Sequence, residues 1–268
     1  MTGETRVPSR GRRIAVLLEY DGSAYRGSQY QENGPSIQSE LESAVEKLTG
    51  ALNGRVAFAG RTDAGVHALG QVAAFDTDAR LTESEFESGL NHFLQTDLAV
   101  RSAKEVDRSF DPRRDALGRV YRYRIDTRPV RSPLLRDRVW RVGRELDIEA
   151  MRHAARRLEG KHDFAAFAGS YEGSTERTLE RCDVSRQCGL VSIEMAARSF
   201  LPHQVRRTVG PLVDVGSGRV TQDALVGLLR SARPASGGPA APACGLYLVR
   251  VEYDGLTFSQ SETDGRDG

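Results

Sequence analysis

The sequence predicts an α+β protein made of two halves with the same order of secondary structure. Apolar stretches typical of strands alternate with stretches of helical periodicity, and turn or capping residues separate them. The resulting order, strand-helix-strand-strand-helix-strand, occupies residues 13–107 and recurs approximately in residues 108–255. This order is the signature of a split, ferredoxin-like (RRM-like) unit. No repeat is visible in the amino-acid sequence itself, so the duplication is inferred from element order alone.

The first half begins with an apolar, strand-like run that an Asp-Gly turn signal ends. Ser36 then caps a helix whose apolar residues recur at helical spacing until Gly50 stops it. Thr82 and Glu85 form a capping box at the start of a second helix. The expected elements are strands at 13–20, 55–59, 71–76 and 98–106, and helices at 37–49 and 82–94.

The second half has the same elements with one additional helix. Asp147 caps its first helix, and Cys188 and Gly189 form the turn between two strands. The expected elements are strands at 118–127, 178–187, 190–199 and 246–253, and helices at 147–158, 203–215 and 221–231. Outside the two halves, we expect residues 1–12 to form a flexible basic arm and residues 256–268 a disordered tail.

Composition excludes several classes of protein. The 268-residue chain is 39% hydrophobic and 28% charged, and no apolar run approaches the roughly 20 residues that a membrane-spanning helix needs. The basic arm contains no apolar stretch of signal-peptide type, so we expect a cytoplasmic protein that does not associate with membranes. The three cysteines and five histidines do not have metal-ligand spacing. We therefore expect no metal site, and reduced, structural thiols.

The net charge of the chain is +1, but the charged residues are unevenly distributed along it. Residues 101–144 contain 14 Arg and Lys against 6 Asp and Glu, a local net charge of +8. Nearly all of the positive charge is arginine, whose planar fork suits phosphate and stacks on bases. A solvated charged face, or the arginine bias of a GC-rich genome, would give the same composition. The segment is a candidate for contacts with a nucleic-acid backbone.

A segment between two of the predicted strands, Gly60 to Ala68, is the candidate for chemistry. It reads Gly-Arg-Thr-Asp-Ala-Gly-Val-His-Ala, and its glycines let the backbone turn sharply and approach a ligand closely. The carboxylate of Asp63 is therefore presented on a loop. An isolated aspartate in such a turn is more typical of a turn former than of a catalyst, so the wider pattern has to decide.

This string, followed by Gly70-Gln71-Val72, resembles the signature of the TruA family of tRNA pseudouridine synthases. Other family-like pieces occur in the same order over residues 14–253. They are Glu19-Tyr20-Asp21-Gly22, Ser36-Ile37-Gln38, Tyr121-Arg122-Tyr123, Asp163-Phe164 with Phe167, His203-Gln204-Val205-Arg206 with Val209-Gly210, and Gly245-Leu246-Tyr247-Leu248.

The resemblance implies a fold and an activity. Two ferredoxin-like halves would form one continuous, mostly antiparallel sheet, with helices on one face and an RNA-binding cleft between the halves. The protein would isomerise uridine to pseudouridine in the anticodon stem-loop of tRNA, at positions 38–40, and would work as a homodimer. It would require neither a cofactor nor a metal.

The resemblance also implies roles for five residues. Asp63 would be the essential aspartate that takes part in breaking the uridine glycosidic bond, and Arg206 would pair with it and favour its ionised form. Tyr121 would stack on the base and is a candidate for proton abstraction, and Leu246 would line the base pocket. Arg61 would assist flipping of the target nucleotide. Without the family match, the tyrosine and leucine would indicate core packing and the arginines surface charge.

Three positions depart from the family pattern. Ser28 stands where the family usually has tryptophan, Gln95 where it has proline, and Arg114 where it has phenylalanine. These positions lie outside the residues with implied catalytic roles, so we expect them to affect packing or RNA contact.

Two alternatives stay open. The same chemistry could act on another RNA or on a small nucleoside or nucleotide, which the departures and the nearly neutral total charge allow. A non-catalytic RNA-binding module is the second alternative, because ferredoxin-like sheets are common RNA platforms. The joint presence of Asp63, Tyr121 and Arg206 argues against that second alternative.

Overall fold

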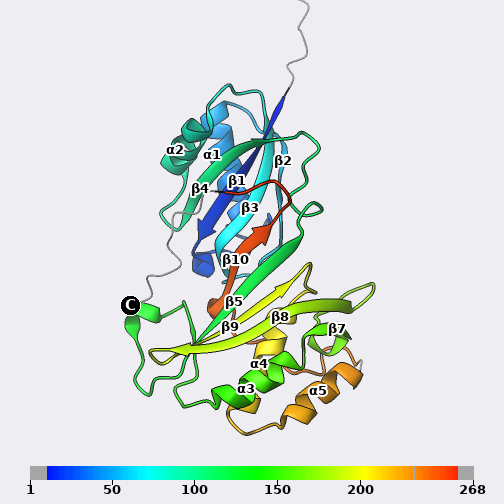
Figure 1. Cartoon of the computed structure of the whole chain (residues 1–268). Coiled ribbons are helices and arrows are strands. Elements are labelled where there is room, and N and C mark those ends of the chain that lie inside the picture. The colour runs from blue at the N-terminus through cyan, green and yellow to red at the C-terminus, as the bar shows by residue number, and fades with distance from the viewer. Residues whose placement is uncertain (1–10, 232, 259–268) are drawn as a thin grey trace, which may run out of the picture.

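The computed structural model of the chain describes residues 11–231 and 233–258. In these residues one ten-stranded sheet runs through an elongated molecule, and five α-helices pack on it (Figure 1). The strands are β1 (Arg12–Tyr20), β2 (Asn53–Phe58), β3 (His67–Thr77), β4 (Leu98–Val106), β5 (Gly118–Asp126), β6 (Trp140–Arg141), β7 (Gly160–Asp163), β8 (Glu176–Gln187), β9 (Leu190–Ala197) and β10 (Leu246–Glu252). The helices are α1 (Ile37–Thr49), α2 (Glu83–Phe93), α3 (Ile148–Arg156), α4 (Gln204–Gly216) and α5 (Gln222–Ser231).

The two halves have the same strand topology. In the first half the spatial order is β4-β1-β3-β2, and every neighbouring pair is antiparallel. In the second half the order is β10-β5-β9-β8, again antiparallel throughout. If the four strands of each half are numbered along the chain, both orders are 4-1-3-2. The duplication that element order predicted is therefore present in the fold.

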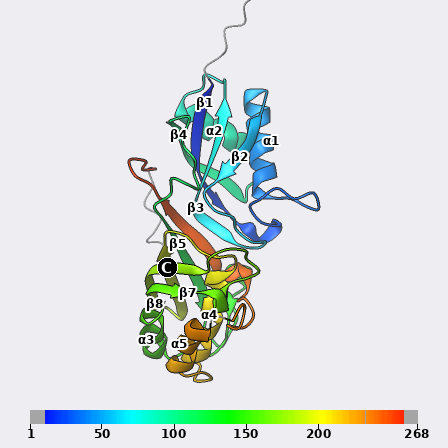
Figure 2. The same cartoon turned by 90° about the vertical axis from the view of Figure 1, so that its right-hand side faces the viewer.

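The halves are joined through the last strand of the chain. β10 pairs with β5 of its own half on one side and, in parallel, with the start of β3 on the other, where Tyr247 faces His67. Figure 2 shows the two halves end to end, with β10 between them. The pairing turns two small sheets into one continuous, mostly antiparallel sheet, which confirms the predicted fold class.

The helices of both halves lie on one face of this sheet. Ala68 of β3 pairs with Leu248 of β10, which pairs with Tyr121 of β5, so these three side chains share a face. They belong to the same buried core as Leu41 of α1 and Val209 of α4. The two groups of helices therefore stand side by side on the same face, and the loops between them meet there.

The helices begin where capping residues were predicted. The Ser36 side chain accepts a hydrogen bond from the Ser39 backbone, and Thr82 and Glu85 complete the predicted capping box. The Asp147 carboxylate accepts from the backbone N–H of Ala150 at 2.9 Å. These caps satisfy N–H groups that the first helical turn leaves without partners.

The structure differs from the prediction in the length and number of strands. β3 begins at His67, four residues before the predicted strand, because its first residues pair with β10 from the other end of the chain. β6 and β7 were not predicted, because strands of two and four residues carry too little alternation to be recognised. The predicted arm and tail lie mostly outside the described residues, although β1 already begins at Arg12.

Within the described residues, no helix has the length and apolar character required to cross a membrane.

Candidate active site

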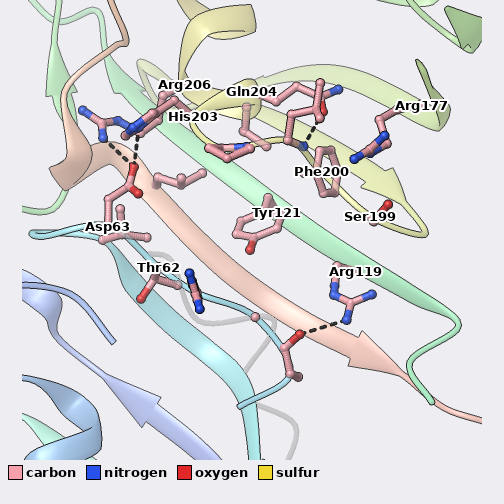
Figure 3. Close-up of a pocket in the computed structure, with 18 of the residues that line it drawn as sticks. Thr62, Asp63, Arg119, Tyr121, Arg177, Ser199, Phe200, His203, Gln204 and Arg206 are labelled. Atoms are coloured by element: carbon pink, nitrogen blue, oxygen red, sulfur yellow. Dashed lines mark hydrogen bonds and ion pairs between the residues drawn. The ribbon is translucent and has the colours of Figure 1, made fainter. Parts of the chain in front are cut away.

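A cavity of about 640 Å³ lies where the two halves meet on the helix-bearing face. Its walls come from the β2–β3 loop of the first half and, in the second half, from β5, the β9–α4 connection and the start of α4. Figure 3 shows Asp63, Tyr121 and Arg206 together in this cavity. Arg61 and Leu246 also line it, so all five residues singled out in the sequence are brought to one place.

The loop that carries Asp63 is fixed through its neighbour Thr62. The Thr62 N–H donates to Ser28 Oγ at 2.8 Å, and the Ser28 N–H donates back to the Thr62 carbonyl at 3.0 Å. The Thr62 hydroxyl also bonds to the hydroxyl of Tyr20 at 2.9 Å. Because the two partners are buried, the position of the loop is set by the interior of the first half.

The approach of these backbones requires glycine at position 27. Gly27 has a φ of +111°, and a Cβ atom there would lie 2.8 Å from the Thr62 carbonyl oxygen. Any larger residue would therefore combine an unfavourable backbone conformation with a clash.

The carboxylate of Asp63 is held by two residues of the second half. Arg206 Nη1 lies 2.7 Å and His203 Nδ1 2.9 Å from the same oxygen, Asp63 Oδ2. Arg206 is itself fixed, because its Nε donates to the Ala241 carbonyl at 2.7 Å. The Asp63 side chain keeps 37% of its surface exposed. A charged, partly exposed carboxylate is thus anchored from one side and open on the other.

Tyr121 forms the floor of the cavity. Its side chain is buried, and its ring packs edge-on against Phe200 with the centroids 5.2 Å apart. Burial raises the pKa of the Tyr121 phenol well above its ordinary value, with a further contribution from the Asp63 carboxylate. The phenol therefore keeps its proton at neutral pH. Leu246 is also buried and adds an apolar surface beside the ring.

The cavity walls are strongly basic. Asp63 is the single acidic residue among the described residues that line it. Besides Arg206, six arginines line the walls: Arg61, Arg113, Arg114, Arg119, Arg177 and Arg198. Such a surface attracts a polyanion and repels other cations.

Arg119 has a role that the sequence did not indicate. Its buried guanidinium donates to three backbone carbonyls, those of Ala59, Arg113 and Arg198, at 2.6–2.8 Å. Burial lowers the pKa of Arg119, although guanidinium stays protonated in proteins. Since Ala59 belongs to the first half and Arg198 to the second, this side chain fastens the two halves together behind the cavity.

The arginines of the basic segment 101–144 include two groups, those that line the cavity and those that form ion pairs within the fold. Arg113, Arg114 and Arg119 line the cavity, as a surface for a nucleic-acid backbone would require. Others form ion pairs with carboxylates outside the segment, such as Arg138 with Asp21 at 2.7 Å. Part of the local charge of +8 is therefore neutralised by the fold.

The three departures from the family pattern lie in different surroundings. Ser28 is buried and supports the Asp63 loop, as described above. Arg114 is exposed, pairs with Asp111 at 3.0 Å and lines the cavity. Gln95 is exposed at the end of α2, away from the cavity lining. Only the first two lie close enough to influence the site.

In the described part of the chain, no three histidine, cysteine, aspartate or glutamate side chains are grouped so that they could hold a metal ion. The cysteines are free thiols, and Cys182 is buried in the core. Among the described residues that line the cavity, the titratable groups are one carboxylate, the phenols of Tyr121 and Tyr171, His203 and the arginines.

Comparison with known proteins assigns this geometry to a family. A family model described as tRNA pseudouridine synthase matches residues 16–113 and 154–254. The tRNA pseudouridine synthase A of Myxococcus xanthus is 47% identical over 244 residues, covering 90% of this chain and 92% of the relative. That of Nitrobacter winogradskyi is 47% identical over 246 residues, covering 91% and 96%.

A more distant similarity concerns a solved structure, a Cbf5-Nop10-Gar1 complex. The similarity covers 75% of this chain and 54% of the chain in that structure, with 10% sequence identity. Its TM-score of 0.30 is too low to support a statement about the family. The family model and the relatives, in contrast, extend through both halves and across the cavity. The chain therefore belongs to the tRNA pseudouridine synthase A family and is an isomerase.

Proposed function

We propose that this protein isomerises uridine to pseudouridine in the anticodon stem-loop of tRNA, at positions 38–40, with Asp63 as the essential residue. The observation that carries this proposal is the anchored Asp63 carboxylate in a cavity whose other charged side chains are cationic. The names of the relatives support tRNA as the substrate. The implied roles of Asp63, Tyr121 and Arg206 support the chemistry.

The product contains no atom of the protein, so the contribution of the protein is to orient the substrate and to stabilise charge. The bond between N1 of uracil and C1′ of the ribose breaks, the base turns, and a bond forms between C5 and C1′. C5 then loses its proton and N1 gains one, either by transfer between them or by exchange with solvent. A carboxylate beside C1′ can attack that carbon or stabilise the positive charge that develops there. Asp63 is exposed to the cavity on one side, as either role requires.

Tyr121 and Leu246 would hold the base during this turn. The Tyr121 ring offers a stacking surface, and Leu246 closes one side of the pocket. Because burial raises the pKa of Tyr121, the phenol enters the reaction protonated. It can therefore donate a hydrogen bond to the uracil, and it would act as a base only if another group accepted its proton.

The arginines would hold the RNA around the reacting nucleotide. A stacked uridine cannot reach Asp63, so it must leave the stem or loop and enter the cavity. Arg61, directly preceding the Thr62-Asp63 pair, is exposed and lines the cavity, a position from which it could fill the vacated space. The exposed arginines of the wall, Arg113, Arg114 and Arg198, would contact phosphates and set the position of the substrate.

We also propose that the enzyme is a cytoplasmic homodimer. The family resemblance supports this assembly, and so do two exposed apolar side chains on the connection between β5 and β6. Val130 is 76% and Leu134 88% exposed, and because both lie on the same connection they offer apolar surface that a second copy could cover. The molecular mass in solution, measured by light scattering, tests the assembly. A monomer at micromolar concentration would contradict it.

The test of the function uses unmodified tRNA transcripts with the purified protein. Pseudouridine is mapped by carbodiimide-dependent primer-extension stops, with Asp63→Asn as the inactive control and transcripts carrying cytidine at positions 38–40 as the substrate control. We expect stops at these positions with the natural protein and none with Asp63→Asn. Product formed equally by Asp63→Asn would refute the catalytic assignment. Stops elsewhere, or product only from a small nucleotide, would refute the assigned substrate.

A further inference from the structure

We propose that His203 is a positioning residue for Asp63. Together with Arg206 it binds one carboxylate oxygen and thereby leaves the other, Oδ1, directed to the substrate. This inference rests on the proposed function, because it assumes that Asp63 acts on the sugar. It assigns a task to a side chain that the sequence pattern included without a role.

The first observation is that two donors converge on a single oxygen. His203 Nδ1 and Arg206 Nη1 both lie within 2.9 Å of Asp63 Oδ2 (Figure 3). Among the residues that the structure describes, no hydrogen bond reaches Oδ1. A carboxylate bound at one oxygen from two directions cannot rotate freely about its last torsion. The unbound oxygen therefore keeps a fixed direction.

The second observation is that the backbone of His203 is held in an uncommon conformation. His203 precedes the first turn of α4 with φ +61° and ψ +2°, the left-handed region that non-glycine residues rarely adopt. Its carbonyl accepts the N–H of Arg207 at 2.9 Å, so the residue is locked to the helix. Such a conformation is strained for a residue with a side chain and persists where the surroundings impose it. Here it turns the ring toward Asp63.

The third observation is that the ring is supported from behind. A Cβ atom added to Gly169 would lie 2.5 Å from His203 Cδ2, so the ring occupies space that only glycine leaves open. The Gly169 N–H donates to the Pro202 carbonyl at 2.8 Å, which fixes this glycine beside the residue preceding His203. The imidazole is thus placed between Gly169 and the Asp63 carboxylate. The contacts described here that place it all come from the protein itself.

The geometry has a kinetic consequence. With Arg206 alone, the carboxylate would keep one anchor and could turn Oδ1 away from C1′. The fraction of productive orientations would fall, while the arginine walls that bind RNA would be unchanged. Loss of one charge-assisted donor at a reacting group typically lowers a rate by about 10- to 100-fold. The loss should appear in the rate of the chemical step and not in the affinity for tRNA.

Two substitutions separate the hydrogen bond from the backbone. Both glycine and asparagine tolerate the left-handed conformation, but only asparagine carries a side-chain N–H close to the place of Nδ1. We expect His203→Gly to lower the single-turnover rate on a tRNA transcript by about 10- to 100-fold, with an unchanged Kd from filter binding. His203→Asn should restore the rate to within about 5-fold of the natural protein.

A third variant tests the support behind the ring. Gly169→Ala should push the imidazole from Asp63 and lower the same rate by about 3- to 10-fold, less than removal of the donor. In the His203→Gly background it should have no further effect, because the ring it displaces is absent. Thermal unfolding of each variant controls for loss of structure.

The outcomes distinguish this inference from the function on which it rests. A full rate for His203→Gly, equal losses for the glycine and asparagine variants, or a parallel loss of tRNA affinity would each overturn the positioning role. Additive effects of Gly169→Ala and His203→Gly would also overturn it. Activity of Asp63→Asn would instead overturn the proposed function, whatever the histidine variants show.

Discussion

The two halves share a strand order but use the equivalent connections differently. In the first half, the connection between the second and third strands is the loop of residues 59–66, which carries Asp63. In the second half the corresponding strands, β8 and β9, are joined by Cys188 and Gly189 alone. After the third strand, the second half has α4, which begins beside His203 and carries Arg206. The active site is thus composite, because one half supplies the carboxylate and the other supplies its anchors.

The two connections also differ in how they are held. The β8–β9 turn has φ values of +49° at Cys188 and +79° at Gly189, which suit a tight two-residue hairpin, and its Gly189 carbonyl accepts hydrogen bonds from the N–H and the hydroxyl of Thr127. The Asp63 loop, in contrast, depends on buried partners such as Ser28. The Asp63 loop is therefore held by buried partners in the interior of its half, whereas the β8–β9 turn combines a favourable hairpin conformation with contacts to one neighbouring residue. This contrast leads to four predictions.

The largest effect is expected where the halves meet. Arg206→Lys should lower kcat about 100-fold, because one ammonium group cannot bond both Asp63 Oδ2 and the Ala241 carbonyl as the guanidinium does. Arg207→Lys is the matched control, since Arg207 donates to the Gly238 carbonyl and not to Asp63, and it should change kcat by less than about 3-fold. Steady-state kinetics on a tRNA transcript measure both. Equal losses in the two variants would show that the composite site does not depend on this pair.

The next effect concerns the packing beneath the Asp63 loop. A Cβ atom on Gly22 would lie 1.9 Å from the Val66 carbonyl oxygen, so Gly22→Ala must displace backbone. We expect a loss of about 3 kcal/mol in the free energy of unfolding. Gly227→Ala, in open space on α5, should instead gain about 0.5–1 kcal/mol. Urea unfolding of both variants measures the difference in the free energy of unfolding. A Gly22→Ala protein as stable as the natural one would contradict the prediction and show that the backbone at Val66 can move at little cost.

A smaller effect is expected at Ser28. Ser28→Ala removes the acceptor of the Thr62 N–H and leaves a buried donor without a partner, which costs about 1–2 kcal/mol. The loosened loop should also lower kcat several-fold, roughly in proportion to the lost hydrogen bond. The exposed Ser88 on α2 provides the control, and Ser88→Ala should change stability by less than about 0.5 kcal/mol. Unchanged kcat in Ser28→Ala would separate loop support from catalysis.

The smallest effect is expected in the β8–β9 turn. Asparagine tolerates positive φ better than cysteine, so Cys188→Asn should raise the free energy of unfolding by a few tenths of a kcal/mol, on the order of 0.3. Its kcat should equal that of the natural protein. A clear loss of activity would indicate that the second half contributes to RNA binding through this turn as well.

The sequence predicted the long elements because they are set locally. Caps such as Ser36 and Asp147 and the apolar periodicity of the helices lie within short windows, and the structure has these helices within two residues of the expected ends. β6 and β7 were not predicted, because they are short and are defined by their pairing with β5 and β8. Local pattern cannot contain that information.

The candidate site likewise contains residues that the sequence could predict and contacts that it could not. Asp63 and Arg206 could be singled out because a resemblance covers both, and the structure brings them to 2.7 Å. The contact of His203 with Asp63 and the contacts of Arg119 with the Ala59 and Arg198 carbonyls required the fold, since each joins residues at least 60 positions apart. Ser28 was expected to affect packing or RNA contact, and its hydrogen bonds instead support the loop of Asp63.

The place of β10 has a consequence for the order of assembly. This strand follows all the other described strands in sequence, yet it occupies the middle of the sheet, between β3 and β5. A nascent chain that has not yet emerged past residue 252 can complete the first half, but it has no strand with which to dock that half on the second. The active site therefore forms only after residue 252 has been synthesised. A chain truncated before Leu246 should retain the arginine-rich surface that attracts tRNA while lacking pseudouridine synthesis, which the same primer-extension assay measures.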